Sequence, residues 1–426
     1  MRSAALVVLW ACGAAAPATA PATGRAPTAA VAPAGPAKAT TTAGAMAAHA
    51  LGMNDVSMLL PLPRAVRAPV VASIAGDGAE PLVDRGTFDA LVTAPGDLGP
   101  KVGTLGAYED FQVVAIRFDL CERLAIGVCP PDVPGRLRLV LQPCEMVGGE
   151  LRTQDIALHA FYPIAAGELA GVIGELRALA AIQGAPADAP LAVSPAAAAG
   201  NAAYLAKLHA LVMRYARADQ LARLTVIGQR ASSAAFAWIF RGVDRDAADA
   251  LNAGAGDRRA AGFTAMAIPG LAAAGGAPAT QQSAFLAGGD TVFDARPVAD
   301  QPAGFALAIN GARFAAAGPD ERRAAIAALV ELQNPARHDT IDTQCLGCHV
   351  ATYLTARRAA ALHVDPAALA GRFAPPYNVA VHSVAGSDPR VVRAFGWAGS
   401  APAISQRVAN DTAEVLAEIA ARFPPR

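Results

Sequence analysis

Hydrophobic and polar residues alternate along several segments of this chain. Leu137, Leu139 and Leu141 alternate with Arg136 and Arg138. A period of two is typical of strands that place one set of side chains on each face of a sheet. Similar segments recur at residues 111–118, 155–160, 221–229, 235–241, 263–268 and 305–309. We expect these segments to form a mainly antiparallel sheet, in which the 111–118 strand is half-buried.

Helical spacing of apolar residues follows in four other segments, at residues 165–181, 196–218, 319–334 and 404–423. The third helix should end before Pro335, because the residue before a proline disfavours helical geometry. Together the two patterns predict an α+β fold. It would consist of a mainly antiparallel sheet body with packed helices over residues 51–333 and a helical portion over residues 334–426.

The N-terminus has the pattern of an export signal. Arg2 precedes a short apolar run over residues 4–11, and Leu9 to Cys12 resembles the lipobox of bacterial lipoproteins. The resemblance implies a signal peptide over residues 1–11 and a lipid on Cys12. The alternative is cleavage after Ala20 at an A-x-A site, which the following Pro21 disfavours. The apolar run is too short to span a bilayer, so we expect attachment to a membrane through the lipid only.

Residues 12–50 consist almost entirely of Ala, Pro, Thr and Gly. A segment of this composition cannot bury enough apolar surface to fold. We therefore expect a disordered linker between the lipid and the folded body.

One short motif indicates a specific chemistry. Cys345, Cys348 and His349 form the pattern C-x-x-C-H, which is the attachment signature of a c-type haem. The segment resembles c-type cytochromes, in which this motif opens a helix, and polar residues before Cys345 can cap such a helix. The resemblance implies a monohaem c-type cytochrome within a bacterial lipoprotein. Cys345 and Cys348 would form the thioethers, and His349 would bind the iron.

The second axial ligand is an open question, because no methionine follows the motif. His382 is the first choice, in a segment that can fold back over the porphyrin. His338 is the second choice and Met266 the third. His363 is excluded, since it lies ~21 Å along the helix from His349. His159 alternates with Ile156 and Leu158, so we expect it to face solvent.

Two other interpretations of the motif remain. The two cysteines could form a redox dithiol or a plain disulfide, although no strand precedes them as in thioredoxin-like sites. Cys345, Cys348 and His349 could instead bind zinc, but an adjacent Cys-His pair chelates poorly and no second pair lies nearby in the sequence.

The remaining cysteines suit an oxidising compartment. Cys121 and Cys129 bracket a short loop, and we expect a disulfide between them. Cys144 would then have no disulfide partner. Pairing of Cys129 with Cys144 is the alternative.

The net charge of the 426-residue chain is zero, which argues against a nucleic-acid partner. Leader and motif together predict an iron-containing haem c protein of the cell envelope, in the periplasm or on the outer membrane. We expect it to carry electrons for a redox partner rather than to catalyse a reaction. The alternatives are a haem-dependent peroxidase or gas sensor with an open distal site, and a structural or binding lipoprotein with the CxxC as a disulfide.

Overall fold

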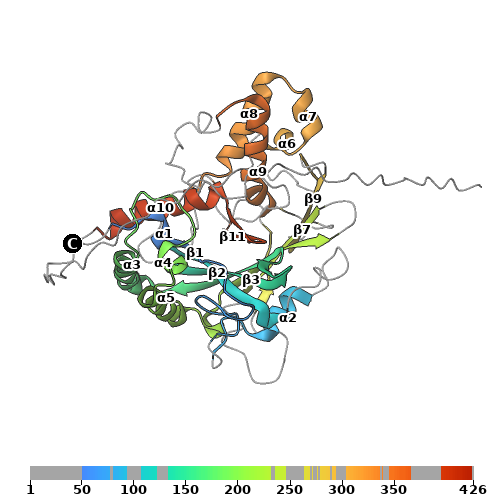
Figure 1. Cartoon of the computed structure of the whole chain (residues 1–426). Helices are drawn as coiled ribbons and strands as arrows, with labels where there is room; N and C mark the ends of the chain where they lie inside the picture. The colour runs from blue at the N-terminus through green and yellow to red at the C-terminus, as the bar shows by residue number, and fades with distance from the viewer. Residues whose placement is uncertain are drawn as a thin grey trace, which may run out of the picture. The chain divides into compact units, whose positions relative to one another are not determined.

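An antiparallel sheet occupies the centre of the computed structural model of this chain (Figure 1). The structure describes residues 50–76, 80–93, 107–121, 133–231, 236–245, 263–268, 271, 276, 279–287, 290–293, 304–335, 338, 345–365 and 395–424. Within these ranges the sheet has ten strands in the order β1-β2-β3-β5-β6-β7-β9-β10, with β4 beside β3 and β8 beside β7. The strands are β1 Ser57–Leu59, β2 Phe111–Asp119, β3 Gly135–Val147, β4 Glu150–Thr153, β5 Ile156–Ile164, β6 Arg223–Ala231, β7 Phe236–Arg245, β8 Phe263–Ala265, β9 Gln281–Ala287 and β10 Thr291–Phe293.

A small hairpin and the helices complete the described fold. The hairpin strands are β11 Phe395–Ala398 and β12 Ala401–Ile404. The helices are α1 Met53–Val56, α2 Arg85–Thr93, α3 Leu169–Gln183, α4 Pro195–Ala198, α5 Ala202–Tyr215, α6 Phe305–Ala308, α7 Gly311–Ala316, α8 Pro319–Glu331, α9 Cys345–Leu362 and α10 Gln406–Arg422. The predicted α+β class is confirmed, and so are the predicted sheet and the helices of the C-terminal portion. Residues 305–309 were expected to form a strand and instead form α6, because a short apolar run does not distinguish the two.

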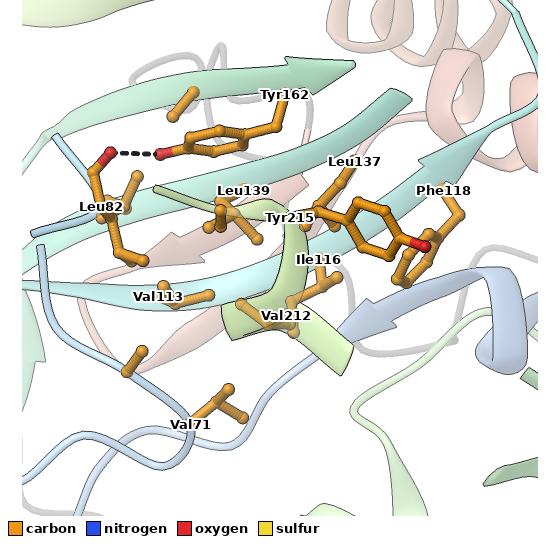
Figure 2. Packing of buried hydrophobic residues seen from close by; sticks show 14 of the residues in the cluster. Val71, Leu82, Val113, Ile116, Phe118, Leu137, Leu139, Tyr162, Val212 and Tyr215 are labelled. Carbon is orange, nitrogen blue, oxygen red and sulfur yellow. Dashed lines mark hydrogen bonds between the residues drawn. The ribbon is translucent and has the colours of Figure 1, made fainter. Parts of the chain in front are cut away.

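Both faces of the sheet are buried. Leu137, Leu139 and Leu158 share one hydrophobic cluster with residues of α3 and α5. Figure 2 shows part of this cluster, in which the hydroxyl of Tyr162 donates to the carbonyl of Leu82 at 2.8 Å. The prediction that the 111–118 strand is half-buried was wrong, because every residue of β2 is buried. Each strand of the centre is therefore covered by a layer on each side.

The second cluster joins the opposite face of the sheet to the C-terminal helices. Val140 and Phe240 of the sheet pack with Leu329 of α8, Leu354 of α9 and Val408 of α10. Residues 47–426 also form one compact unit. Residues from both sides of the predicted boundary between residues 333 and 334 fill this cluster.

A buried ion network fixes α10 against the sheet. Asp119 of β2 accepts from Arg117 at 2.7 Å and from Arg138 at 3.1 Å. Asp411 of α10 accepts from Arg117 at 3.1 Å and pairs with Arg407 at 2.9 Å. Burial alone raises the pKa of Asp119, but the neighbouring guanidinium groups of Arg117 and Arg138 outweigh it and hold that pKa at about 2. The carboxylate is thus charged and fully paired in the folded protein.

Several sequence predictions fall outside the described residues. These concern the leader, Cys12, the linker up to residue 49, Cys129 and His382. Cys121 forms a disulfide. Cys144 is a buried free thiol, so the alternative pairing of Cys129 with Cys144 is not formed. In the part of the chain that the structure describes, no helix has both the length and the apolar character needed to cross a membrane.

Substitution of Asp119 tests the ion network. We expect Asp119→Asn to lower the free energy of unfolding by about 3–5 kcal/mol, because it removes the carboxylate that pairs with Arg138 and one of the two carboxylates that pair with Arg117. Urea unfolding at pH 7 measures this loss. Because the pKa of Asp119 is depressed in the folded state, its stabilisation is present above about pH 4 and is lost as the pH falls toward 2. The difference in the free energy of unfolding between wild type and Asp119→Asn should therefore decrease as the pH falls over that range.

Glu150→Gln provides the matched control. Glu150 pairs with Arg152 at 2.9 Å on the surface, where its side chain is 66% exposed. An exposed pair contributes little, so we expect a change within about 0.5 kcal/mol. A loss for Asp119→Asn no larger than that of the control would contradict the importance of the network.

Candidate functional site

The C-x-x-C-H motif opens helix α9. As the sequence predicts, the helix begins at Cys345 and continues to Leu362. The first backbone N–H groups of a helix have no partner within it. Here the N–H of Leu346 donates to the side-chain oxygen of Gln282, on strand β9, at 3.0 Å. The start of the motif helix is therefore tied directly to the sheet.

A buried polar cluster fixes α9 between its two neighbouring helices. The side chain of Gln333, just after α8, donates to Thr355 at 3.0 Å and accepts from Thr352 at 2.9 Å. Its carbonyl accepts from Asn410 of α10 at 2.6 Å. The hydroxyl of Thr352 also accepts from the N–H of Gln406 at 3.0 Å. These bonds set the position of α9 relative to α8 and α10.

All three motif side chains line one cavity of about 140 Å³, which is partly open to solvent. Helices α9 and α10 form one wall, and the sheet forms the other. The sheet contributes Arg138, His159, Phe161, Arg223, Thr225, Ile227 and Phe240, among others, and Met266 lines the cavity from just after β8. The motif therefore faces the sheet and not the outside of a separate helical domain.

The register of the sheet defines the floor of this cavity. His159 of β5 lies opposite Thr225 of β6, and Thr225 lies opposite Gly242 of β7. Directly paired residues share a face of the sheet. His159, Thr225 and Gly242 thus form one row across three strands. Because Thr225 and Gly242 are small, this row leaves space above the sheet.

Met266 closes the other end of this row. Its N–H donates to the carbonyl of Gly242 at 2.9 Å. A Cβ atom at position 242 would lie 3.1 Å from the Cε of Met266 and 2.8 Å from the Cγ2 of Thr225. The absence of a side chain at Gly242 therefore lets the Met266 thioether lie over the sheet, in the cavity that the motif lines.

The imidazole of His349 packs on an aromatic ring of the sheet. Its centroid lies 5.0 Å from that of Phe240, with an angle of 56° between the rings. Phe240 stands two residues from Gly242 on the same face of β7, a separation of ~7 Å. His349 is thus held beside the place that Met266 occupies.

The neighbouring row of the sheet gives the cavity a cationic side. Arg138 lies opposite Phe161, and Phe161 lies opposite Arg223. The guanidinium of Arg138 stacks 4.9 Å from the centroid of the Phe161 ring. Arg407 of α10 lines the same cavity. The site therefore has an apolar side near Phe240 and a cationic side near these arginines.

His159 was expected to face solvent, and this was wrong. It is half-buried and lines the cavity opposite α9. The expectation assumed that the second face of the sheet is exposed. The sequence contains a contrary signal, since Ala157 and Phe161, two residues before and after it, are both apolar. A histidine between apolar residues of the same alternation indicates a buried face with one polar position.

The other histidines considered as axial ligands lie in different places. His338 is 7% exposed and does not line the cavity, although its carbonyl accepts from Arg407. His363 is exposed, follows the last turn of α9 and has a φ of 53°. It lies away from the motif, as the sequence predicts. His382 lies outside the described residues.

Burial makes Cys345 a poor nucleophile. It raises the pKa of the Cys345 thiol to about 12, and the neighbouring Cys348 adds to the rise. Reactive cysteines in redox dithiols need a lowered pKa, since the thiolate is the attacking species. The environment of Cys345 therefore does not favour the redox-dithiol alternative.

A zinc site needs three or four protein ligands. Across the described ranges, no group of three or more His, Cys, Asp or Glu side chains is placed to hold a metal ion. This offers no support for a zinc site at the motif. It does not bear on a haem, whose iron is held by the porphyrin and needs only one or two protein ligands.

The residues present fit a covalently held haem in their chemistry. Two thiols and one imidazole lie on one wall, and a thioether and a second imidazole lie on the other. The cationic side suits the carboxylates of the porphyrin edge. The cavity is smaller than the ~300–1,000 Å³ typical of cofactor sites, so it could enclose only part of a haem, and the rest would lie at its open mouth.

Alkylation tests the environment of Cys345. In protein produced without covalent haem, we expect iodoacetamide to modify Cys345 at pH 7.5 roughly 100-fold more slowly than it modifies glutathione, because the thiolate is scarce. Mass spectrometry of the peptide measures the rate. The same reaction in urea is the control and should be fast. Fast modification of the folded protein would instead favour the redox dithiol.

Comparison with known proteins does not add a family to this description. No family model matches the chain, and no curated protein or solved structure matches it. The interpretation of the site therefore depends on its motif and on the geometry of the described residues.

Proposed function

We propose that this protein is an exported, lipid-anchored monohaem c-type cytochrome that transfers single electrons at the cell envelope. The observation that carries the proposal is that Cys345, Cys348 and His349 line one cavity at the start of a helix. Cysteines three positions apart lie on neighbouring faces of a helix, so both sulfurs can reach the edge of one porphyrin.

A haem held in this way supplies a one-electron couple at its iron. The chain's own residues would position it. Cys345 and Cys348 hold one edge through thioethers, and His349 binds the iron. Phe240 supports the imidazole of His349, and Gln282 keeps the first turn of α9 on the sheet.

Among the described residues, Met266 would be the side chain best placed to hold the iron together with His349. It lies over Gly242, about one side-chain spacing along β7 from Phe240, on which His349 packs. His159 is in the same row but two strands from Gly242, ~10 Å away. His382 remains the ligand that the sequence predicts. A second ligand on the facing wall favours an electron carrier over the peroxidase or gas-sensor alternative, which needs an open site.

The cellular setting of the proposal rests on the N-terminal sequence. The leader over residues 1–11 and the lipobox-like segment at Cys12 support export and a lipid anchor in the periplasm or on the outer membrane. The electron would pass to a redox partner protein, and the zero net charge offers no support for a nucleic-acid partner.

Covalent haem is the first test. We expect full-length protein produced with a cytochrome c maturation system to give a pyridine haemochrome spectrum with one haem per chain. Cys345→Ser and Cys348→Ser should each shift that spectrum toward a haem with one thioether fewer, while Cys144→Ser should leave it unchanged, since Cys144 does not line the cavity. Protein without covalent haem would reject the proposal and leave the structural or binding lipoprotein with a disulfide.

The axial ligand is the second test. We expect Met266→Ala to convert the reduced protein from a low-spin to a high-spin spectrum and to let it bind carbon monoxide. His159→Ala is the matched control from the same row and should stay low-spin. If His382→Ala alone gives the change, the ligand is His382. Carbon monoxide binding by the wild type would favour the open-site alternative.

A further inference from the structure

A second cavity lies along α9 beyond the motif. It has a volume of about 610 Å³, within the range of small-molecule sites, and lies between α7, α8 and the C-terminal half of α9. It shares no lining residue with the cavity at the motif. Arg357 of its wall follows His349 by eight positions, ~12 Å along the helix. The two cavities are therefore separate sites.

Positive charge is concentrated around this second cavity. Arg322, Arg357 and Arg358 line it, and Asp290 is the one carboxylate in its lining. Three guanidinium groups and one carboxylate leave a local charge of +2. The whole chain has a net charge of zero, so this is a local excess.

Arg358 forms a rigid base for the cavity. It is 4% exposed, and its Nε donates to the carbonyl of Ala308 at 3.0 Å. A second nitrogen donates to the backbone carbonyl of Asp290. Its guanidinium stacks 4.8 Å from the centroid of the Phe314 ring. These contacts fix one cation in place before any ligand arrives, which lowers the entropic cost of binding.

The other two arginines have hydrogen-bond donors that no carboxylate of the described residues uses. Neither Arg322 nor Arg357 pairs with a carboxylate of the described chain, whereas the adjacent Arg323 pairs with Asp320 at 3.5 Å. The Nε of Arg322 is buried and, among the described residues, has no hydrogen-bond partner. A buried donor without an acceptor destabilises the folded protein, and an acceptor within the cavity would remove that cost.

We propose that this cavity binds a small dianionic oxyanion, a phosphate or a dicarboxylate. Guanidinium groups bind the oxygens of both in paired hydrogen bonds. The charge of +2 matches a dianion, and small residues such as Gly311 and Ala360 leave the walls open to a compact ligand. The site is independent of the proposed haem function, because it shares no residue with that cavity.

Calorimetry on the full chain tests the proposal. Inorganic phosphate and succinate are titrated in separate arms at low ionic strength, and we expect saturable binding of one ligand per chain in at least one arm. Arg322→Gln and Arg357→Gln should each weaken that binding at least tenfold. Arg323→Gln is the matched control, one residue along the same helix and outside the cavity, and should leave the affinity unchanged.

Two calorimetric results would overturn the proposal. One is the absence of saturable binding in both arms. The other is an equal loss of affinity in Arg323→Gln and Arg322→Gln, which would show a general charge effect. Arg357 is exposed, so Arg357→Gln should fold normally and keeps the test valid if Arg322→Gln does not fold. In the haem-loaded protein the Soret band should not move on binding, and a shift would place the anion in the first cavity instead.

Discussion

The structure depends on the burial of both faces of one antiparallel sheet. Many antiparallel sheets bury one face and leave the other in water. Here β2 is buried along its whole length, and the strands beside it carry apolar residues in both alternations. Each face therefore needs its own layer of helices. Helices α3 and α5 cover one face, and α8, α9 and α10 cover the other. The motif helix lies where it does because the second face must be covered.

The parts of the fold that the sequence predicts are those with a local period. The central strands and the helices α3, α8 and α10 follow from periods of two and 3.6, and the start of α9 follows from its motif. Short elements were missed, such as β9, β10 and the hairpin of β11 and β12, since runs of three to seven residues carry little periodic signal. The neighbourhood of the motif was missed for a different reason. Nothing near residue 266 or residue 159 in the sequence indicates that either lies opposite residue 349. That proximity follows from strand pairing and from the missing side chain at Gly242.

One helix connects the two sites that we propose. The motif occupies the first turn of α9, and Arg357 and Arg358 stand near its end. The hydrogen bonds of Gln333 to Thr352 and Thr355 hold the middle of the helix between them. A helix fixed at its centre keeps both ends in position. The packing of α9 therefore fixes the position of one wall in each cavity, although the two cavities share no lining residue.

The ion network that attaches α10 also shapes the first cavity. Arg138, Arg407 and Asp411 belong to the network and line that cavity, and Arg117 joins Asp411 to Asp119. Buried charges are tolerated only when they are paired, so Asp119 and Asp411 are what allow these arginines to stand beside an otherwise apolar space. Loss of either carboxylate would loosen α10 and also change the charge of the cavity. The stability of the fold and the charge of the cavity are thus linked on the cationic side. On the side of Met266, Thr225 and Gly242 these three residues are uncharged, so we expect a substitution of Met266 to affect the fold less.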